Sequence, residues 1–147
     1  MLEPGLESRE LSALTLIAEH DGRTGDWLRI RIDLSQSGTV RLVDRLVSRE
    51  LVHRGRAGGR ALPLHVTPEG AAVLAAWAQG RDDVATDLLV AVSPASRGEV
   101  VAGMAAALQG RERFRPEADA TCRRCTCTAC GDDCLVDRSV AGKAEPL

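Results

Sequence analysis

The chain of 147 residues is poor in aromatic residues, with one Phe, two Trp and no Tyr. Its core must therefore consist mainly of aliphatic side chains, and recognition of single-stranded nucleic acid by stacking on aromatic rings is not expected. The sequence has no run of about 18 apolar residues and no basic leader followed by an apolar segment and a cleavage site. We therefore expect a cytoplasmic protein that does not contact a membrane.

Common catalytic motifs are also absent. The sequence contains no nucleophile elbow, no phosphate-binding glycine loop and no paired-carboxylate arrangement, so an enzyme is not expected. The three histidines, His20, His53 and His65, fall in separate predicted elements, where surface or phosphate-contacting positions are more common than metal ligands. An apolar content of 44% is enough for the core of one domain.

Charge is unevenly distributed along the chain, although the net charge is only −2. Residues 23–60 contain nine Arg against four Asp or Glu, a local balance of +5, whereas residues 1–22 and 61–147 sum to −4 and −3. A basic block between acidic ones is typical of a confined phosphate-binding surface.

Residues 34–66 carry the strongest structural signal. Ser35 is a suitable N-cap, because its hydroxyl can accept a hydrogen bond from an amide of the first turn. The apolar residues that follow recur at spacings of three and four and predict a helix with one buried face: Val40, Leu42, Val43, Leu46, Val47 and Leu51. The opposite face is expected to carry residues spaced by four: Ser37, Arg41, Arg45 and Arg49. Guanidinium groups suit phosphates and guanine edges, although a solvated arginine-rich face is the alternative.

A basic hairpin is predicted directly after this helix. Residues 51–54 are expected to form a short strand, and residues 55–60 a loop whose glycines permit positive φ. Residues 62–66 alternate as in a half-buried strand. Pro63 lacks an amide donor, which places that strand at a sheet edge. A helix followed by a basic hairpin indicates a winged helix.

This stretch resembles the core of the multiple-antibiotic-resistance regulator (MarR) family of winged helix-turn-helix transcription factors. The resemblance spans about residues 7–112, and its most specific parts are residues 35–37 (SQS), 41–46 (RLVDRL), 59–62 (GRAL) and 64–70 (LHVTPEG). It implies a homodimer that binds a near-palindromic operator in double-stranded DNA. The residues expected to contact DNA are Ser35, Gln36, Ser37, Thr39, Arg41, Arg45, Arg49, Arg56 and Arg60.

The resemblance is incomplete at the wing and at the N-terminus. The family usually has an aspartate at the wing tip that orients the arginine reaching into the minor groove. Here Arg60 has the arginine position, but Gly58 stands where the aspartate would be. The family usually also has a helix, shared between subunits, ahead of the one expected from Ser8 to near Gly22. Almost none of it is present, so the dimer is expected to rely on its C-terminal part.

The remaining helices are assigned from position and capping. Residues 24–32 could alternate as a strand, but their place before the recognition helix favours a helix. Thr67-Pro68 and Ser93-Pro94 both predict helix starts, with helices to about Val92 and Arg113. Their apolar faces are expected to form a two-fold dimer interface; the alternative is that they cover the domain's own core. Helical structure is expected to end at residues 114–116.

Five cysteines lie within residues 122–134, and in a reducing compartment disulfides are not expected. Two cysteines separated by two residues, as in C-x2-C, can direct both sulfurs at one ion. Zinc usually takes two such pairs with a longer spacer, so the tight spacing favours an iron–sulfur cluster of the 4Fe–4S type, with zinc as the alternative. The spacing C-x2-C-x4-C-x3-C, similar to tails on some MarR-like proteins, selects Cys122, Cys125, Cys130 and Cys134; Cys127 could replace Cys125.

These observations predict a mainly α fold with a small β-wing, C-terminal dimerisation helices and an irregular cysteine-rich tail. The expected divisions are residues 1–67 for DNA binding, 68–114 for dimerisation and 115–147 for the metal-binding tail. The function expected is a transcription regulator whose cluster senses redox state, oxygen, nitric oxide or iron. The alternatives are a regulator with a structural zinc site, or a cluster-carrying protein-interaction module that does not bind DNA.

Overall fold

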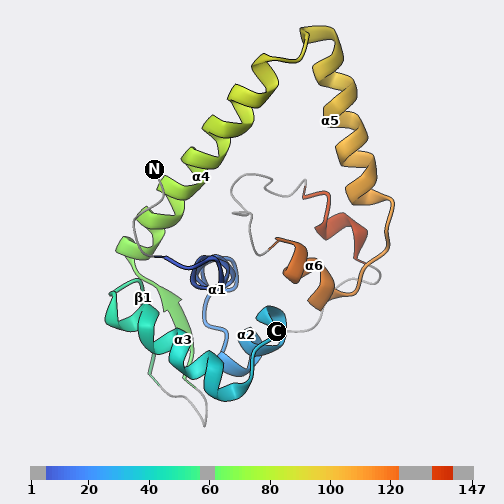
Figure 1. Cartoon of the computed structure of the whole chain (residues 1–147). Helices are drawn as coiled ribbons and strands as arrows, with labels where there is room; N and C mark the ends of the chain where they lie inside the picture. Colours follow the sequence, from blue (N-terminus) through green and yellow to red (C-terminus); the bar gives the residue numbers. More distant parts are fainter. Residues whose placement is uncertain (1–5, 57–61, 123–133, 141–147) are drawn as a thin grey trace.

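The computed structural model describes residues 6–56, 62–122 and 134–140. Its elements, in chain order, are α1 (Ser8–Glu19), α2 (Gly25–Ile32), α3 (Gln36–Ser48), β1 (Val52–Arg54), β2 (Leu64–Val66), α4 (Pro68–Val90), α5 (Pro94–Gln109), α6 (Arg115–Cys122) and a 3-10 turn, η3 (Asp137–Ser139). Figure 1 shows α1 to α3 and the two strands gathered at one end, with α4 extending away from them and α5 running back toward α6. This is the predicted class, mainly helical with a two-stranded wing.

The first three helices form the helix-turn-helix unit and its aliphatic core. Thr24 Oγ1 accepts a hydrogen bond from the Trp27 amide at 3.4 Å, and Ser35 Oγ accepts one from the Gly38 amide at 3.1 Å, so both caps are made by local side chains. Residues 24–32 therefore lead into and form a helix rather than a strand. The largest fully buried side chains are Leu14, Leu16, Leu28, Leu42, Leu46, Val52 and Thr15.

The wing strands are antiparallel, with Val52 opposite Val66 and Arg54 opposite Leu64. Pro63 precedes β2 and its carbonyl oxygen accepts the Gly55 amide at 2.8 Å. The α4 helix begins directly behind the sheet, with Pro68 in its first turn and Thr67 as its N-cap. Gly70 is required there, because a Cβ at this position would collide with the Leu51 carbonyl oxygen.

The long helices α4 and α5 leave most of their apolar side chains in solvent. Only Gly70 and Leu74 of α4 are buried, and no residue of α5 is. Val84, Leu88 and Met104 are 60%, 69% and 65% exposed. In the part of the chain that the structure describes, most apolar side chains of α4 and α5 are therefore not packed in a hydrophobic core.

The start of the tail differs from the sequence prediction. Helical structure does not end at residues 114–116, because α6 begins at Arg115 and packs beside α2 (Figure 1). The cause is a contact distant in sequence: Ala118 and Asp119 of α6 are buried against the helix-turn-helix unit. Among the described helices, none combines the length and the apolar character needed to cross a membrane.

Candidate nucleic-acid interface

The N-terminal half of α3 presents a polar surface to solvent. Gln36, Ser37 and Arg41 are all exposed, and together with Ser35 and Val40 they line a shallow hollow. Ser35 carries the cap, so its hydroxyl is already engaged with the Gly38 amide and lies near Ser37 Oγ at 3.3 Å. Arg41 has no ion-pair partner among the described residues. This half of the helix therefore offers donors and acceptors that no other part of the described protein uses.

Two residues of α3 lie on the opposite side from their predicted positions. Thr39 was assigned to the DNA-facing surface, but it is 3% exposed and its Oγ1 donates to the Ser35 carbonyl oxygen at 3.1 Å. Val40 was assigned to the core, but it is 50% exposed. The buried side of the helix is formed by Thr39, Leu42, Val43 and Leu46. Their spacing of three and four places Val40 outside.

The C-terminal half of the predicted arginine stripe is tied to α1. Arg45 Nε donates to Glu10 Oε1 at 2.7 Å, and Arg49 Nη1 lies 3.6 Å from Glu10 Oε2. Glu10 itself is 3% exposed, and its Oε2 accepts the Glu7 amide at 3.0 Å. Burial alone would raise the pKa of the Glu10 carboxyl, but the hydrogen bonds from Arg45 and Glu7 and the arginine charges hold that pKa below its ordinary value.

The same contact affects Arg45 and the way it can be used. The hydrogen bond to Glu10 raises the pKa of Arg45, which keeps the guanidinium charged. Half of the Arg45 side chain remains exposed, so the group is fixed against α1 while part of it still faces solvent. Of the four residues in the stripe, Ser37 and Arg41 are the ones that point outward without such an anchor.

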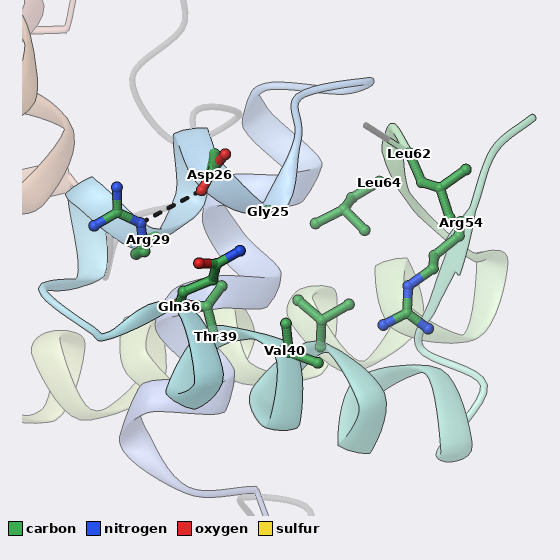
Figure 2. Close-up of a pocket in the computed structure, with 10 residues that line it drawn as sticks. Gly25, Asp26, Arg29, Gln36, Thr39, Val40, Arg54, Leu62 and Leu64 are labelled. Atoms are coloured by element: carbon green, nitrogen blue, oxygen red, sulfur yellow. Dashed lines mark ion pairs between the residues drawn. The ribbon is translucent and has the colours of Figure 1, made fainter. Parts of the chain in front are cut away.

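The wing and α3 are joined by an ion pair that the sequence pattern did not reveal. Arg54 Nη2 of β1 donates to Asp44 Oδ1 of α3 at 2.6 Å. A cleft of about 270 Å³ lies beside this pair, between α2, α3 and the wing (Figure 2). Arg56, predicted to contact DNA, is exposed two residues beyond β1, whereas Arg60 lies outside the described residues.

The two wing histidines lie together, as neighbours on paired strands. The rings of His53 and His65 stack with centroids 5.1 Å apart, and His65 Nδ1 is 2.9 Å from Asp21 Oδ1. Because Asp21 belongs to the α1–α2 connection, this contact fixes β2 to the helix-turn-helix unit.

A buried ion pair joins α6 to the helix-turn-helix unit. Arg31 Nε of α2 donates to Asp119 Oδ2 at 2.6 Å, with the two side chains 5% and 3% exposed. The Arg31 guanidinium also lies over the Trp27 ring, 3.9 Å from its centroid. Arg115 Nη1 and His20 Nε2 approach Asp119 Oδ1 at 3.8 Å each. No sequence motif marks this pair, whose members are 88 residues apart.

The predicted metal ligands fall mostly outside the described residues. Cys125 and Cys130 are outside them, as is Cys127, and Cys122 ends α6. Cys134 is a free, half-buried thiol whose Sγ accepts the Asp137 amide at 3.4 Å. Such a bond suits a thiolate that ligates a metal. Within the described ranges no group of three or more candidate ligands comes together, so the cluster stays a prediction.

No protein family profile and no curated protein sequence matches the chain. Several solved structures do. RV1404 of Mycobacterium tuberculosis aligns with a TM-score of 0.66 at 23% identity, over 71% of this chain and 73% of that one. MepR, a transcription regulator of Staphylococcus aureus, aligns with a TM-score of 0.62 at 16% identity, over 71% and 79%. The Streptococcus pneumoniae protein FabT, solved in complex with DNA, aligns with a TM-score of 0.56 at 12% identity, over 67% and 71%.

The chain has the winged helix-turn-helix fold of MarR-type regulators. This confirms the predicted fold class, mainly helical with the β1–β2 hairpin as the wing. The proteins that share this fold include transcription regulators.

Proposed function

We propose that this protein is a sequence-specific, DNA-binding transcription regulator of the MarR type. The observation that carries the proposal is the exposed N-terminal half of α3, where Gln36, Ser37 and Arg41 form a polar surface beside a basic wing. Solved structures of FabT and of a MepR variant that share the fold were determined with DNA bound. The local charge of +5 over residues 23–60 supplies the attraction to phosphates.

Fluorescence anisotropy with a duplex selected from a random library tests this function. We expect a near-palindromic site with half-sites about one helical turn apart, and an affinity that falls steeply with salt. Arg41→Ala should weaken binding by about 1–3 kcal/mol if Arg41 reads a base, and should lower the salt slope by about one if it contacts only phosphate. Arg111→Ala is the control, because Arg111 is exposed on the chain beyond α5.

Failure to select any duplex, or equal binding by wild type and Arg41→Ala, would contradict the assignment of α3. The alternative of a protein-interaction module predicts the first result. Arg45→Ala is a less direct test, since removing this side chain also leaves Glu10 without its closest partner.

Homodimerisation belongs to the same proposal and is supported by the long helices. A second copy of α4 and α5, related by a two-fold axis, would bury these exposed apolar residues against the same residues of the other subunit. Two recognition helices in one dimer would then account for a palindromic operator.

The cysteine tail is proposed to hold an iron–sulfur cluster, with zinc as the alternative. The four proposed ligands, Cys122, Cys125, Cys130 and Cys134, supply thiolates, which suit both metals. The described contacts hold the two ends of the tail against the rest of the protein. Asp119 holds α6 on α2, and the Arg113 amide donates to the Ser139 carbonyl oxygen at 2.9 Å.

The cluster is proposed to regulate DNA binding through α6. Cys122 is one helical turn beyond Asp119, so a metal that holds Cys122 also restrains the helix that contacts α2. A regulatory effect needs only about 1–3 kcal/mol of difference in DNA affinity between metal-loaded and metal-free protein.

Anaerobic purification followed by absorption spectroscopy and metal analysis tests the tail. We expect brown protein that bleaches with oxygen or nitric oxide, loss of the cluster in Cys134→Ser, and its retention in Cys127→Ser as the matched control. Colourless protein with one zinc per chain would replace the sensor with a structural site. Equal operator affinity with and without metal would refute the regulatory role alone.

A further inference from the structure

Val40 is the apolar residue on the outward side of the recognition helix. It is 50% exposed, whereas Leu42, Val43 and Leu46 of the same helix are almost fully buried. It lies one turn after Gln36, which is also exposed. Figure 2 shows Gln36 and Val40 on α3 with Leu62 and Arg54 across the cleft. An apolar side chain therefore interrupts the polar surface at the point where α3 would meet a base pair.

We propose that Val40 is a specificity-determining residue that contacts the C5-methyl group of a thymine in the major groove. This inference rests on the proposed DNA-binding function and adds a named base contact to it. In the major groove, thymine presents the one methyl group, and apolar side chains distinguish it from cytosine through that group. The branched side chain of valine presents two methyl groups at a nearly fixed angle, since its χ1 is restricted in a helix.

The neighbours of Val40 fit a step that contains an A·T pair. A glutamine such as Gln36 can bond both N6 and N7 of adenine, and it is next to Val40 along the helix face. The charged residues of the following turn are already engaged: Asp44 with Arg54 at 2.6 Å and Arg45 with Glu10 at 2.7 Å. The free reading surface is thus confined to the first turns of α3, where Val40 is its apolar member.

Replacing thymine by uracil removes only the methyl group, so it isolates this contact. Anisotropy titrations would compare wild type and Val40→Ala on the selected operator and on duplexes with uracil at each thymine in turn. We expect one thymine in each half-site whose replacement by uracil lowers the affinity of wild type about four-fold. This is the effect expected from no longer burying one methylene-sized group. Val40→Ala should bind the thymine duplex more weakly and show no further loss with uracil at that position.

Two further variants test whether the result for Val40→Ala comes from a change in folding. Ser48→Ala lies on the exposed, C-terminal part of α3 and should keep the four-fold loss. Val40→Thr retains the size of the side chain and exchanges one methyl for a hydroxyl, and it should lower the methyl sensitivity in a protein whose circular dichroism is unchanged.

The possible failures are distinguishable. If Val40→Ala keeps the full loss with uracil, or wild type is insensitive at every thymine, the contact is refuted while DNA binding stands. If both Val40 variants lose thermal stability and retain the wild-type methyl sensitivity, Val40 serves in packing and the proposal is wrong. If no form of the protein binds a selected duplex, the proposed function fails as well.

Discussion

Removing the Asp119 carboxylate should release α6 from the helix-turn-helix unit. In the wild type, Arg31 and Asp119 are both almost fully buried and their hydrogen-bonded atoms are 2.6 Å apart. In Asp119→Ala the Arg31 guanidinium would retain its contact with the Trp27 ring and the bond from Nη1 to the Trp27 carbonyl oxygen at 3.3 Å, but it would lose the bond from Nε to Asp119. A buried guanidinium would then have lost a short bond to a buried carboxylate.

The cost follows from the burial of both groups. Breaking a buried ion pair by removing one partner typically destabilises a protein by about 3–5 kcal/mol. That range is an upper bound here, because α6 can detach and let water reach Arg31. The loss in global stability is then limited to the free energy with which α6 docks on α2. We therefore expect a fall of about 2–4 kcal/mol in the free energy of unfolding, with faster hydrogen exchange in residues 115–122.

Urea denaturation, followed by circular dichroism, measures the free energy of unfolding. Hydrogen exchange of residues 115–122 measures the release of α6. All variants would be compared in the same metal-loading state. Thr121→Ala, an exposed change on the same helix, is the control and should stay within about 0.5 kcal/mol of wild type. The double variant Arg31→Met/Asp119→Leu should recover most of the loss, because a hydrophobic pair can replace a buried ion pair. A loss below about 1 kcal/mol in Asp119→Ala, with unchanged exchange in α6, would refute this account.

Three further predictions concern the titration of Glu10, the titration of His20 and the exposed apolar surface of α4. The pKa of Glu10 is held below its ordinary value of 4.5, so the ionised group stabilises the fold above about pH 4.5, and this contribution is lost as pH falls through the lower pKa of the folded state. In Glu10→Gln the urea midpoint should therefore depend less on pH between pH 5 and 3 than in wild type. An unchanged pH dependence would contradict this account. Burial and the nearby arginines lower the pKa of His20, although the Asp119 charge acts in the opposite direction, so NMR should show His20 titrating below pH 6.5. The wild-type protein should lose stability as pH falls below 6.5, and His20→Gln should lose less. Leu88→Asp places a charge on an exposed apolar position of α4. If the proposed dimer forms through α4 and α5, this variant should be monomeric in light scattering without loss of helicity, whereas Asp87→Ala should remain dimeric.

Local signals in the sequence were sufficient for most elements of the fold. Ser35 and the Thr67-Pro68 pair cap their helices with side chains that act within three residues, so both helix starts could be predicted. Residues 24–32 were ambiguous because Leu28 and Ile32, both buried, suit a helix face and also fall within an alternating strand-like pattern. Their position before the helix proposed to read DNA gave the correct assignment.

Contacts between distant residues account for what the sequence did not reveal. Spacing by four predicted that Arg45 and Arg49 would face DNA with Arg41, but Glu10 lies 35 residues before Arg45 and no local pattern indicates that it would bind them. Val40 was misplaced for a related reason. It satisfies the apolar spacing of the helix, and only the packing of α3 on its neighbours shows that Thr39 takes the buried position.

The position of α6 changes how a signal in the tail would reach DNA. The sequence alone places the tail after the helices proposed for dimerisation, a route in which ordering of the tail would act through the dimer interface. The structure supplies a shorter path, since α6 contacts α2 directly and α2 packs on α3. Asp119 would then transmit a change at Cys122 through a single turn of helix to Arg31. In that mechanism Asp119→Asn should abolish the dependence of operator affinity on metal without lowering metal content, whereas a route through the dimer interface would leave that dependence intact.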